Sequence, residues 1–272
     1  MPTITKTQFE NYIRRNRKAF LRLTVEQERE LAKMYLETAK SIKLKILDAS
    51  GAEIWQQQQI LNAVLSDAAR LSKNFEDTIY QNLIQAADLG VEVDKTILAD
   101  ITHRLAGKGL EFDAERVLFG VPSLAVEDAY NRVWRDGLKL SDRIWALDRH
   151  TRNELESIVG QFMISGAPAS DPETIARLEW LLNPDRVGIT TKLHGRSVSF
   201  DAARLLRAER SIAYQEAQVY SAMRNPAAIG IAWILSSRHP RDDICDDYAR
   251  HDEGLGRGVY RPENLPVRPH PQ

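Results

Sequence analysis

The sequence predicts a mainly α-helical protein, with a helical bundle-like N-terminal region and a mostly helical C-terminal domain that carries one or a few short strands and an irregular C-terminal tail. Apolar residues recur at helical spacing from Thr7 to about Leu147. Side-chain pairs typical of helix starts punctuate this pattern. After Leu235 the composition changes, because three of the six histidines and five of the eleven prolines follow it. The periodicity predicts the fold class, and the change after Leu235 predicts the tail.

Individual helices are predicted from apolar stripes and from the residues that end them. Three pairs fit the capping box S/T-x-x-E/Q, in which side chains satisfy the free amides of a helix start: Thr24 with Gln27, Thr151 with Glu154, and Ser170 with Glu173. Pro172 suits a first helical turn, where its missing N–H would have no partner. With glycine and proline as end markers, we expect helices over 6–22, 25–49, 53–73, 75–88, 94–106, 111–118, 123–147, 151–165, 171–182 and 199–224.

Two stretches before the tail break the helical pattern. Residues 183–198 indicate a connecting loop. Residues 227–235 (AAIGIAWIL) are apolar, partly β-branched and short, which favours a strand. Residues 236–272 are expected to be irregular because of their prolines and glycines.

Composition excludes several classes of protein. The chain has 272 residues, 43% of them hydrophobic and 28% charged, and a formal net charge of -1, so it shows no overall preference for nucleic acid, membranes or acidic substrates. Cys245 is the only cysteine, which excludes an intramolecular disulfide and any zinc site that takes two cysteines from this chain. The first twenty residues do not resemble a signal peptide, and no apolar stretch is long enough for a bilayer. We expect a soluble protein made in a reducing cytoplasm.

The tail contains the strongest cluster of potential metal ligands, and two interpretations are open. The cluster comprises His239, Asp242, Asp243, Cys245, Asp246, Asp247, His251 and His270. Imidazole, thiolate and carboxylate together can complete a tetrahedral zinc shell, which would order the tail. Alternatively, the acidic side chains cap turns while Tyr248, Val259 and Tyr260 pack the tail onto the helical body. No cofactor is otherwise expected, and zinc is the one candidate.

Two groups of charged residues are candidates for binding. Six basic side chains stand against the single acidic Glu10 in the first 23 residues. Arg14, Arg15, Arg17 and Lys18 are therefore candidates for binding nucleic acid through its phosphates, or they form an ordinary solvated helix face. A second group, in residues 199–224, indicates either ion pairs within the protein or an anion site. It comprises Arg204, Arg207, Glu209 and Arg210.

No common enzyme motif is found in the sequence. It contains no G-x-S-x-G, no G-x-x-x-x-G-K-[ST], no H-E-x-x-H and no strand-linked G-x-G-x-x-G. Gly254, Gly256 and Gly258 have the wrong spacing for phosphate binding and indicate a flexible turn. The isolated His103, His150 and His194 lack neighbouring partners in the sequence. We expect a protein that is not an enzyme and has no catalytic residues.

Residues from about 120 to 272 resemble the head morphogenesis family of tailed bacteriophages, the minor head proteins similar to the F protein of phage Mu. The resemblance is ordered along the chain. It begins at LSDRIWALDRHTRNELESIVGQFMISGAP, continues through ETIARLEWLL and AARLLRAERSIAYQEAQVYSA, and closes with Trp233, HPRDDICDDYA, GVY and LPVRPHP. The closing block is the specific part. Family members commonly carry further cysteines in this region, whereas this sequence has Cys245 alone. The resemblance therefore implies His239, Cys245 and His270 as the residues that could bind zinc.

The resemblance implies a division of the chain and a function. Residues 1–119 would be a helical extension and residues 120–272 the head morphogenesis-like domain, with its tail at 236–272. The protein would be a minor structural protein of the phage head, made in the host bacterial cytoplasm and found in the virion. It would act in capsid assembly near the portal and in DNA packaging or delivery. Its expected partners are the portal protein, capsid or scaffold proteins and packaged DNA. The alternatives are a nucleic-acid-binding module that uses the N-terminal basic helix and an ADP-ribosyltransferase-like enzyme.

Overall fold

A computed structural model describes residues 5–48, 54–105, 113–134, 136–165, 171–183, 197–235 and 242–266. The predicted fold class is confirmed: the described residues are mainly helical, with a small two-stranded antiparallel sheet near the C-terminus. The helices are α1 (Lys6–Asp48), α2 (Ile54–Leu105), α3 (Ala114–Val117), α4 (Val121–Asn131), α5 (Leu140–Ser165), α6 (Pro172–Leu182), α7 (Val198–Arg224) and α8 (Ile244–Arg250). The strands are β1 (Ile231–Ala232) and β2 (Val259–Tyr260), and a 3-10 turn covers Pro262–Asn264.

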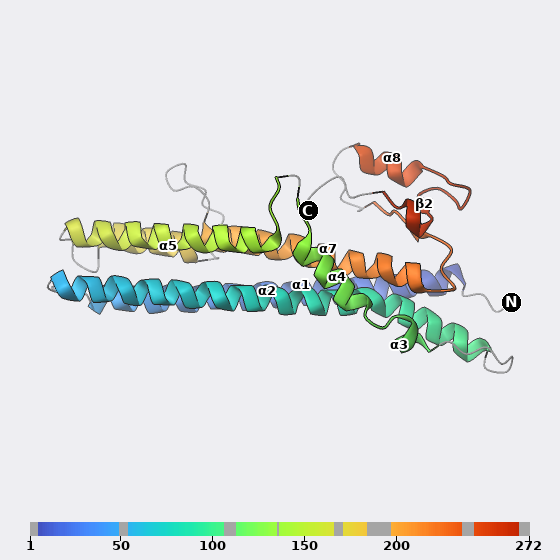
Figure 1. The fold of residues 1–272 in the computed structure, drawn as a ribbon, viewed down its shortest axis with the longest axis horizontal. Coiled ribbons are helices and arrows are strands. Elements are labelled where there is room, and N and C mark those ends of the chain that lie inside the picture. Colours follow the sequence, from blue (N-terminus) through green and yellow to red (C-terminus); the bar gives the residue numbers. More distant parts are fainter. Residues whose placement is uncertain are drawn as a thin grey trace. The chain divides into compact units, whose positions relative to one another are not determined.

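The N-terminal helices are longer than the sequence predicted. Each of α1 and α2 runs as one helix (Figure 1), so the expected breaks near residues 23–24, 74 and 89–93 are wrong. The capping box expected for Thr24 and Gln27 is wrong, because α1 continues through both residues. Gln27 is instead almost fully buried, and its Nε2 donates to the Asn82 carbonyl oxygen at 3.5 Å. Local capping signals are worth about 1 kcal/mol, which packing of a continuous apolar face outweighs.

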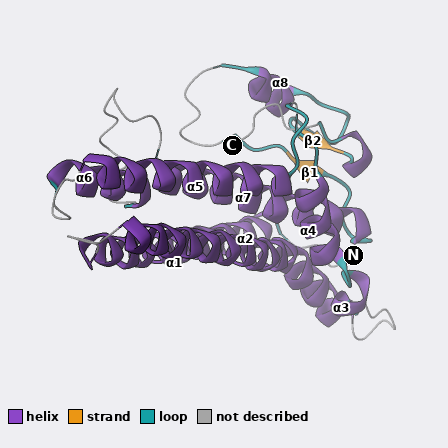
Figure 2. Ribbon diagram, turned by 60° about the vertical axis from the view of Figure 1, so that its left-hand side comes forward, coloured by secondary structure: helices purple, strands orange, loops and turns teal. Residues whose placement is uncertain are grey.

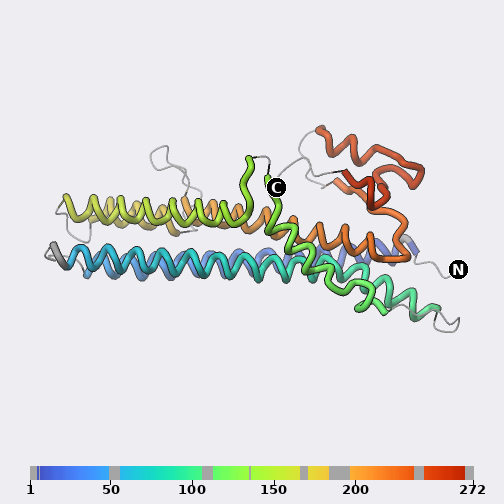
Figure 3. The backbone as a smooth tube through the Cα atoms, viewed as in Figure 1, coloured from blue at the N-terminus to red at the C-terminus, as the bar shows by residue number. Residues whose placement is uncertain are grey.

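The expected helix over 123–147 is divided in two. α4 ends at Asn131 and α5 begins at Leu140, and the residues described between them are not helical (Figure 3). Gly137 has a φ of +78° there, which a glycine adopts without strain. Asp142 accepts a hydrogen bond from the Lys139 N–H at 2.8 Å at the start of α5.

α5 continues through the helix start that the sequence placed at Thr151. The Thr151 hydroxyl donates to the Leu147 carbonyl oxygen one turn earlier, at 2.8 Å. This is the pattern of a threonine inside a helix, so the capping box predicted for Thr151 and Glu154 is wrong.

α6 and α7 lie where the sequence placed them, within one residue at each end. Asp171 is the N-cap of α6 and accepts from the Thr174 N–H at 2.9 Å, with Pro172 in the first turn as predicted. Ser170, the expected cap, lies outside the described residues.

The tail is more ordered than predicted. α8 was not expected, and the strand predicted over 227–235 is limited to Ile231–Ala232. β1 and β2 pair in antiparallel register, Ile231 opposite Tyr260 and Ala232 opposite Val259. Figure 2 shows this small sheet together with α8.

The contacts divide the chain into two compact units, each assembled from separate segments. Unit 1 comprises residues 1–22, 83–129 and 208–272, and unit 2 comprises residues 23–82 and 130–207. The division at residue 119/120 rests on the family resemblance and stays a prediction.

In unit 2, α1 and α2 pack antiparallel. Ser41 bonds to Asp67 and Gln27 bonds to Asn82, so partner numbers rise in one helix as they fall in the other. The core between the helices is apolar, with Leu31, Ile42, Leu71 and Ile79 almost fully buried. Tyr35 and Phe75 meet edge to face, with ring centroids 6.5 Å apart.

In unit 1, small residues allow the helices to approach closely. Gly90 on α2 faces α7 so closely that a Cβ atom there would lie 2.8 Å from the Ala217 Cβ and in collision with the Tyr214 carbonyl oxygen. This packing explains why α2 continues through Gly90, where the sequence predicted its end. Across the described residues, no helix is long and apolar enough to cross a bilayer.

Candidate functional site

The acidic residues at the start of α8 act as helix caps. The Asp243 side chain accepts from the Cys245 N–H at 2.7 Å, and the Asp246 side chain accepts from the Asp243 N–H at 2.9 Å, which completes a capping box. Asp252 similarly accepts from the N–H groups of Gly254 and Gly256, at 2.8 and 3.0 Å. These contacts support the capping interpretation of the tail.

Cys245 lies beside acidic groups at the start of α8. Burial raises the pKa of its thiol, and a hydrogen bond with Asp243 and the charges of Asp243 and Asp246 raise this pKa further. His239 and His270 lie outside the described residues. Among the residues with described positions, no three His, Cys, Asp or Glu side chains gather around one point. The zinc site stays a prediction.

Aromatic residues join the parts of the tail. Trp233 meets Tyr248 of α8 edge to face, with centroids 5.2 Å apart. The Tyr260 hydroxyl donates to the Tyr248 carbonyl oxygen at 2.7 Å, and the Tyr260 ring stacks on His251. The contacts of Tyr248, Val259 and Tyr260 described here therefore join α8, β1 and β2 within the tail. The expected packing of these residues onto the helical body stays a prediction.

Gly258 makes the closest backbone approach in the tail. Its φ is +70°, and a Cβ at this position would lie 2.9 Å from the Ala249 carbonyl oxygen and 3.1 Å from that of Trp233. Its N–H donates to the His251 carbonyl oxygen, and its own carbonyl oxygen accepts from the Trp233 N–H, both at 2.7 Å. The GLGRG segment is thus a defined turn in which Gly258 fits against α8 and the strand.

The basic residues predicted to bind nucleic acid lie near the start of α1 and are exposed. Arg14, Arg15, Arg17 and Lys18 all point away from the core of unit 1. Between them, Asn16 is buried and donates to the Leu89 carbonyl oxygen at 2.7 Å. Asn16 also accepts a hydrogen bond from the Tyr214 hydroxyl. Asn16 therefore fixes which face of α1 is directed outward.

Phe20 and Arg210 lie next to the hydrogen bond between Asn16 and Tyr214 in unit 1. Phe20 stacks on Tyr214 with centroids 4.1 Å apart, and the Arg210 guanidinium lies 5.9 Å from the centre of the Phe20 ring. Burial raises the pKa of Tyr214 to about 12, with a hydrogen bond to Gln218 and the charge of Arg17 acting in the opposite direction. Tyr214 is therefore neutral at physiological pH.

The Arg/Glu group of α7 does not form one anion site. Arg207 belongs to unit 2 and pairs with Glu28 through two hydrogen bonds of 2.7 and 3.2 Å. Arg210 and Glu209 are buried in unit 1, and Arg204 is exposed. For Arg207, the structure supports the interpretation as an internal ion pair.

Two polar clusters of the structure were not predicted from the sequence. In unit 1, Asp94 accepts from the Ser221 hydroxyl at 2.7 Å and from the Asn225 side-chain amide at 2.6 Å, which fixes the end of α7 to α2. Burial raises the Asp94 pKa, and these two hydrogen bonds partly offset that effect.

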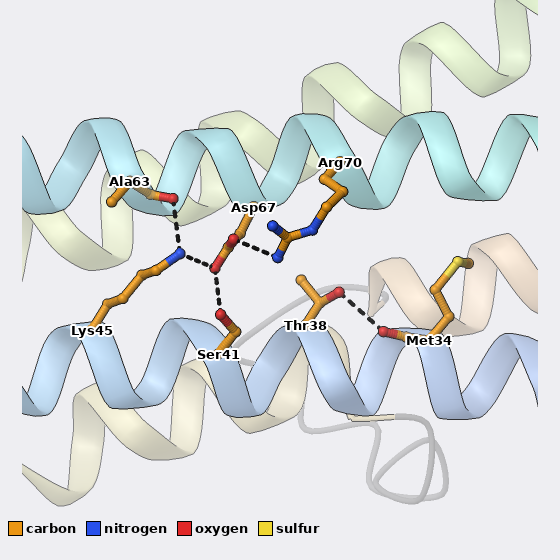
Figure 4. A network of polar contacts seen from close by, with 7 residues as sticks. All are labelled: Met34, Thr38, Ser41, Lys45, Ala63, Asp67 and Arg70. Carbon is orange, nitrogen blue, oxygen red and sulfur yellow. Dashed lines mark hydrogen bonds and ion pairs between the residues drawn. The ribbon is translucent and has the colours of Figure 1, made fainter.

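The second cluster surrounds Asp67 in unit 2 (Figure 4). Its buried carboxylate accepts from the Ser41 hydroxyl at 2.8 Å and from Arg70 at 2.7 Å, and it pairs with Lys45. Lys45 also donates to the Ala63 carbonyl oxygen at 3.3 Å. In the sequence, Asp67 and Asn16 are each a polar residue within an apolar stripe. That position was the signal that could have indicated a buried polar contact.

Unit 2 also contains a small, partly open pocket of about 10 Å³. Its lining includes Tyr35, Phe75, Asp148 and Thr151. A space of this size holds about one water molecule, so it does not accommodate a substrate.

Comparisons with known protein families, with curated proteins and with solved structures found no match. The described residues form a mainly helical protein with two compact units, whose segments alternate along the sequence, and a folded C-terminal tail.

Proposed function

We propose that this protein is a minor structural protein of a tailed-phage head that acts without catalysis in head assembly near the portal. The observation that carries the proposal is the closing block of the family resemblance, from Trp233 through HPRDDICDDYA to GVY. Helices alone are too common to support a function, whereas this ordered block is specific.

The contacts within the tail support the proposal by giving the resembling residues a common physical role. Trp233 contacts Tyr248, Asp243 caps α8, and Gly258 fits against the backbone of Ala249 and Trp233. Tyr260 closes the group through its bond to Tyr248. Residues far apart in the block thus depend on one another, which is expected if the block is a folding unit and not a chance series of similar residues.

The virion proposal is tested by peptide mass spectrometry of phage particles purified from the strain that carries this gene. We expect peptides of this protein at low copy in particles with filled heads, and particles of reduced infectivity or defective assembly when the gene is deleted. Complementation with the intact gene controls for effects on neighbouring genes. Absence of the protein from both procapsids and mature particles would sink the virion proposal.

A second test addresses the tail. Gly258→Val should prevent the close approach to Ala249 and Trp233, and a β-branched residue strains the positive φ. We expect the variant to be lost from particles. Gly254→Ala is the control, because Gly254 also has positive φ but has open space around it. Normal incorporation of the Gly258 variant would show that the folded tail is not needed in the head.

A further inference from the structure

The exposed side of α1 at residues 14–22 carries one continuous basic face. At 3.6 residues per turn, Arg14, Arg15, Arg17, Lys18 and Arg22 fall within an arc of about 160°. All five are exposed, and the buried Asn16 lies on the opposite side of the helix. Arg22, which sequence reasoning did not choose as a site residue, belongs to this face by its position.

The five basic side chains make no ion pair with any residue whose position is described. Further along the same helix, Lys33, Lys43 and Lys45 each pair with a carboxylate. The start of α1 therefore concentrates positive charge that no ion pair with a described residue neutralises, in a chain whose net charge is only -1.

We propose that this basic face binds the phosphate backbone of duplex DNA without sequence preference. From Arg14 to Arg22 the helix rises about 12 Å. Duplex DNA presents one negative charge per about 1.7 Å of its axis, so this length offers more phosphates than the face has cations. Its Arg and Lys side chains, with Leu21 between them, can neutralise phosphates whatever the base sequence, because phosphate contacts carry no sequence information. Charge complementarity alone therefore supplies the binding.

The helix that carries the basic face is held in place by other contacts, which favours binding to DNA. Asn16 is fixed by its bonds to Leu89 and Tyr214, and Phe20 is stacked on Tyr214, so the basic side chains project from a helix that is held on its opposite side. A preformed backbone places the charges without an ordering cost at binding. This proposal is independent of the head-protein proposal, because it concerns binding by the purified protein.

The test is fluorescence anisotropy with a short labelled DNA duplex and the intact chain, over a salt series. Five phosphate contacts predict a slope of log K against log salt of about −4.5, a loss of about 500-fold in affinity between roughly 50 and 200 mM salt. The triple variant Arg14→Gln, Arg15→Gln, Lys18→Gln should reduce the slope to about −1.8, a loss of about 12-fold over the same range. A duplex of unrelated sequence should bind equally well.

The matched control removes the same charge from the same side of α1, at least about two turns beyond Arg22. Arg29→Gln, Lys33→Gln, Lys40→Gln replaces three exposed residues of α1 and should leave the slope unchanged. If the first triple variant unfolds, the single variants Arg14→Gln and Lys18→Gln should each lower the slope by about 0.9. Failure of the wild-type protein to bind duplex at low salt, an unchanged slope in the variants, or an equal effect in the control would overturn the proposal. Preference for one duplex sequence would overturn its non-specific character.

Discussion

Asp67 is a carboxylate placed in the apolar interface between α1 and α2, where its charge depends on specific partners. Burial by itself raises its pKa, but hydrogen bonds from Lys45 and Ser41 and the charges of Lys45 and Arg70 more than offset burial, so the net effect lowers the pKa. The ionised form is therefore favoured in the folded protein. The cluster selects the register of the two helices, because a shift of α1 would separate Ser41 and Lys45 from Asp67.

Replacing Asp67 by Asn tests this role. The neutral amide cannot accept from Lys45, Ser41 and Arg70 together, so we expect the free energy of unfolding at neutral pH to fall by about 1–3 kcal/mol. Asp77→Asn removes an exposed carboxylate of the same helix and should change it by less than about 0.5 kcal/mol. Urea denaturation of both variants gives the comparison. Equal stability of the two variants would show that the cluster is dispensable.

The Asp67→Asn variant also tests how the stability of the protein depends on pH. Because the folded pKa of Asp67 lies below its unfolded value of about 3.9, its contribution is complete above the unfolded pKa and is lost as pH falls through the folded pKa. The stability difference between the wild type and Asp67→Asn should therefore be constant near neutrality and shrink below about pH 4. Thermal unfolding at a series of pH values measures it. A difference that grows on acidification would contradict the assigned direction.

At the scale of elements, two glycines within helices have opposite roles. Gly90 is required where α2 meets α7, since an added Cβ would collide with the Tyr214 carbonyl oxygen and lie 2.8 Å from the Ala217 Cβ. Gly160 in α5 has no such neighbour within 4 Å. The first glycine allows tertiary packing, whereas the second only lowers helix propensity.

Alanine at each position separates these roles. We expect Gly90→Ala to destabilise the protein by about 1–3 kcal/mol, because the helices must move apart. Gly160→Ala should instead be neutral or stabilise it by up to about 1 kcal/mol. Differential scanning calorimetry of the two variants shows the sign of each change. A stabilising Gly90→Ala would mean that α2 and α7 are further apart than described.

α8 depends on its capping box because the helix is short. Asp243→Ala removes the side-chain acceptor for the Cys245 N–H, at an expected local cost of about 1 kcal/mol. Amide hydrogen exchange in residues 244–250 should quicken about fivefold. Asp242→Ala, next in the chain and exposed, is the matched control and should leave the exchange rates nearly unchanged. Identical rates in the two variants would remove the role assigned to the box.

At the scale of the molecule, each of the two units combines segments that are distant in the sequence. Unit 1 combines the start of the chain with residues 83–129 and the C-terminal part, and unit 2 combines 23–82 with 130–207. Each unit thus contains residues from both sides of position 119/120. The apolar faces of α5, α6 and α7 include the buried Leu155, Leu178 and Leu206.

A fragment comprising residues 120–272 is therefore expected to unfold without cooperativity, because each unit has lost its α1 and α2 segments. Circular dichroism during heating measures this, with the full chain as the reference. Adding the separate fragment 1–119 should restore a cooperative transition. A sharp transition in 120–272 alone would show that this region folds independently, as the family resemblance predicts for it.

The sequence by itself determined the helical class and the limits of α6 and α7. These features follow from apolar periodicity and from Pro172 in a first turn. Tertiary structure alone decided that α1 and α2 continue through Thr24 and Gly90, that Thr151 lies inside α5, and that Asp67 finds its partners across the helix pair. The physical reason is the distance along the sequence over which each interaction acts. A capping signal involves three or four neighbouring residues and contributes about 1 kcal/mol to stability. Burial of a long apolar face sums over many side chains that are distant in the sequence.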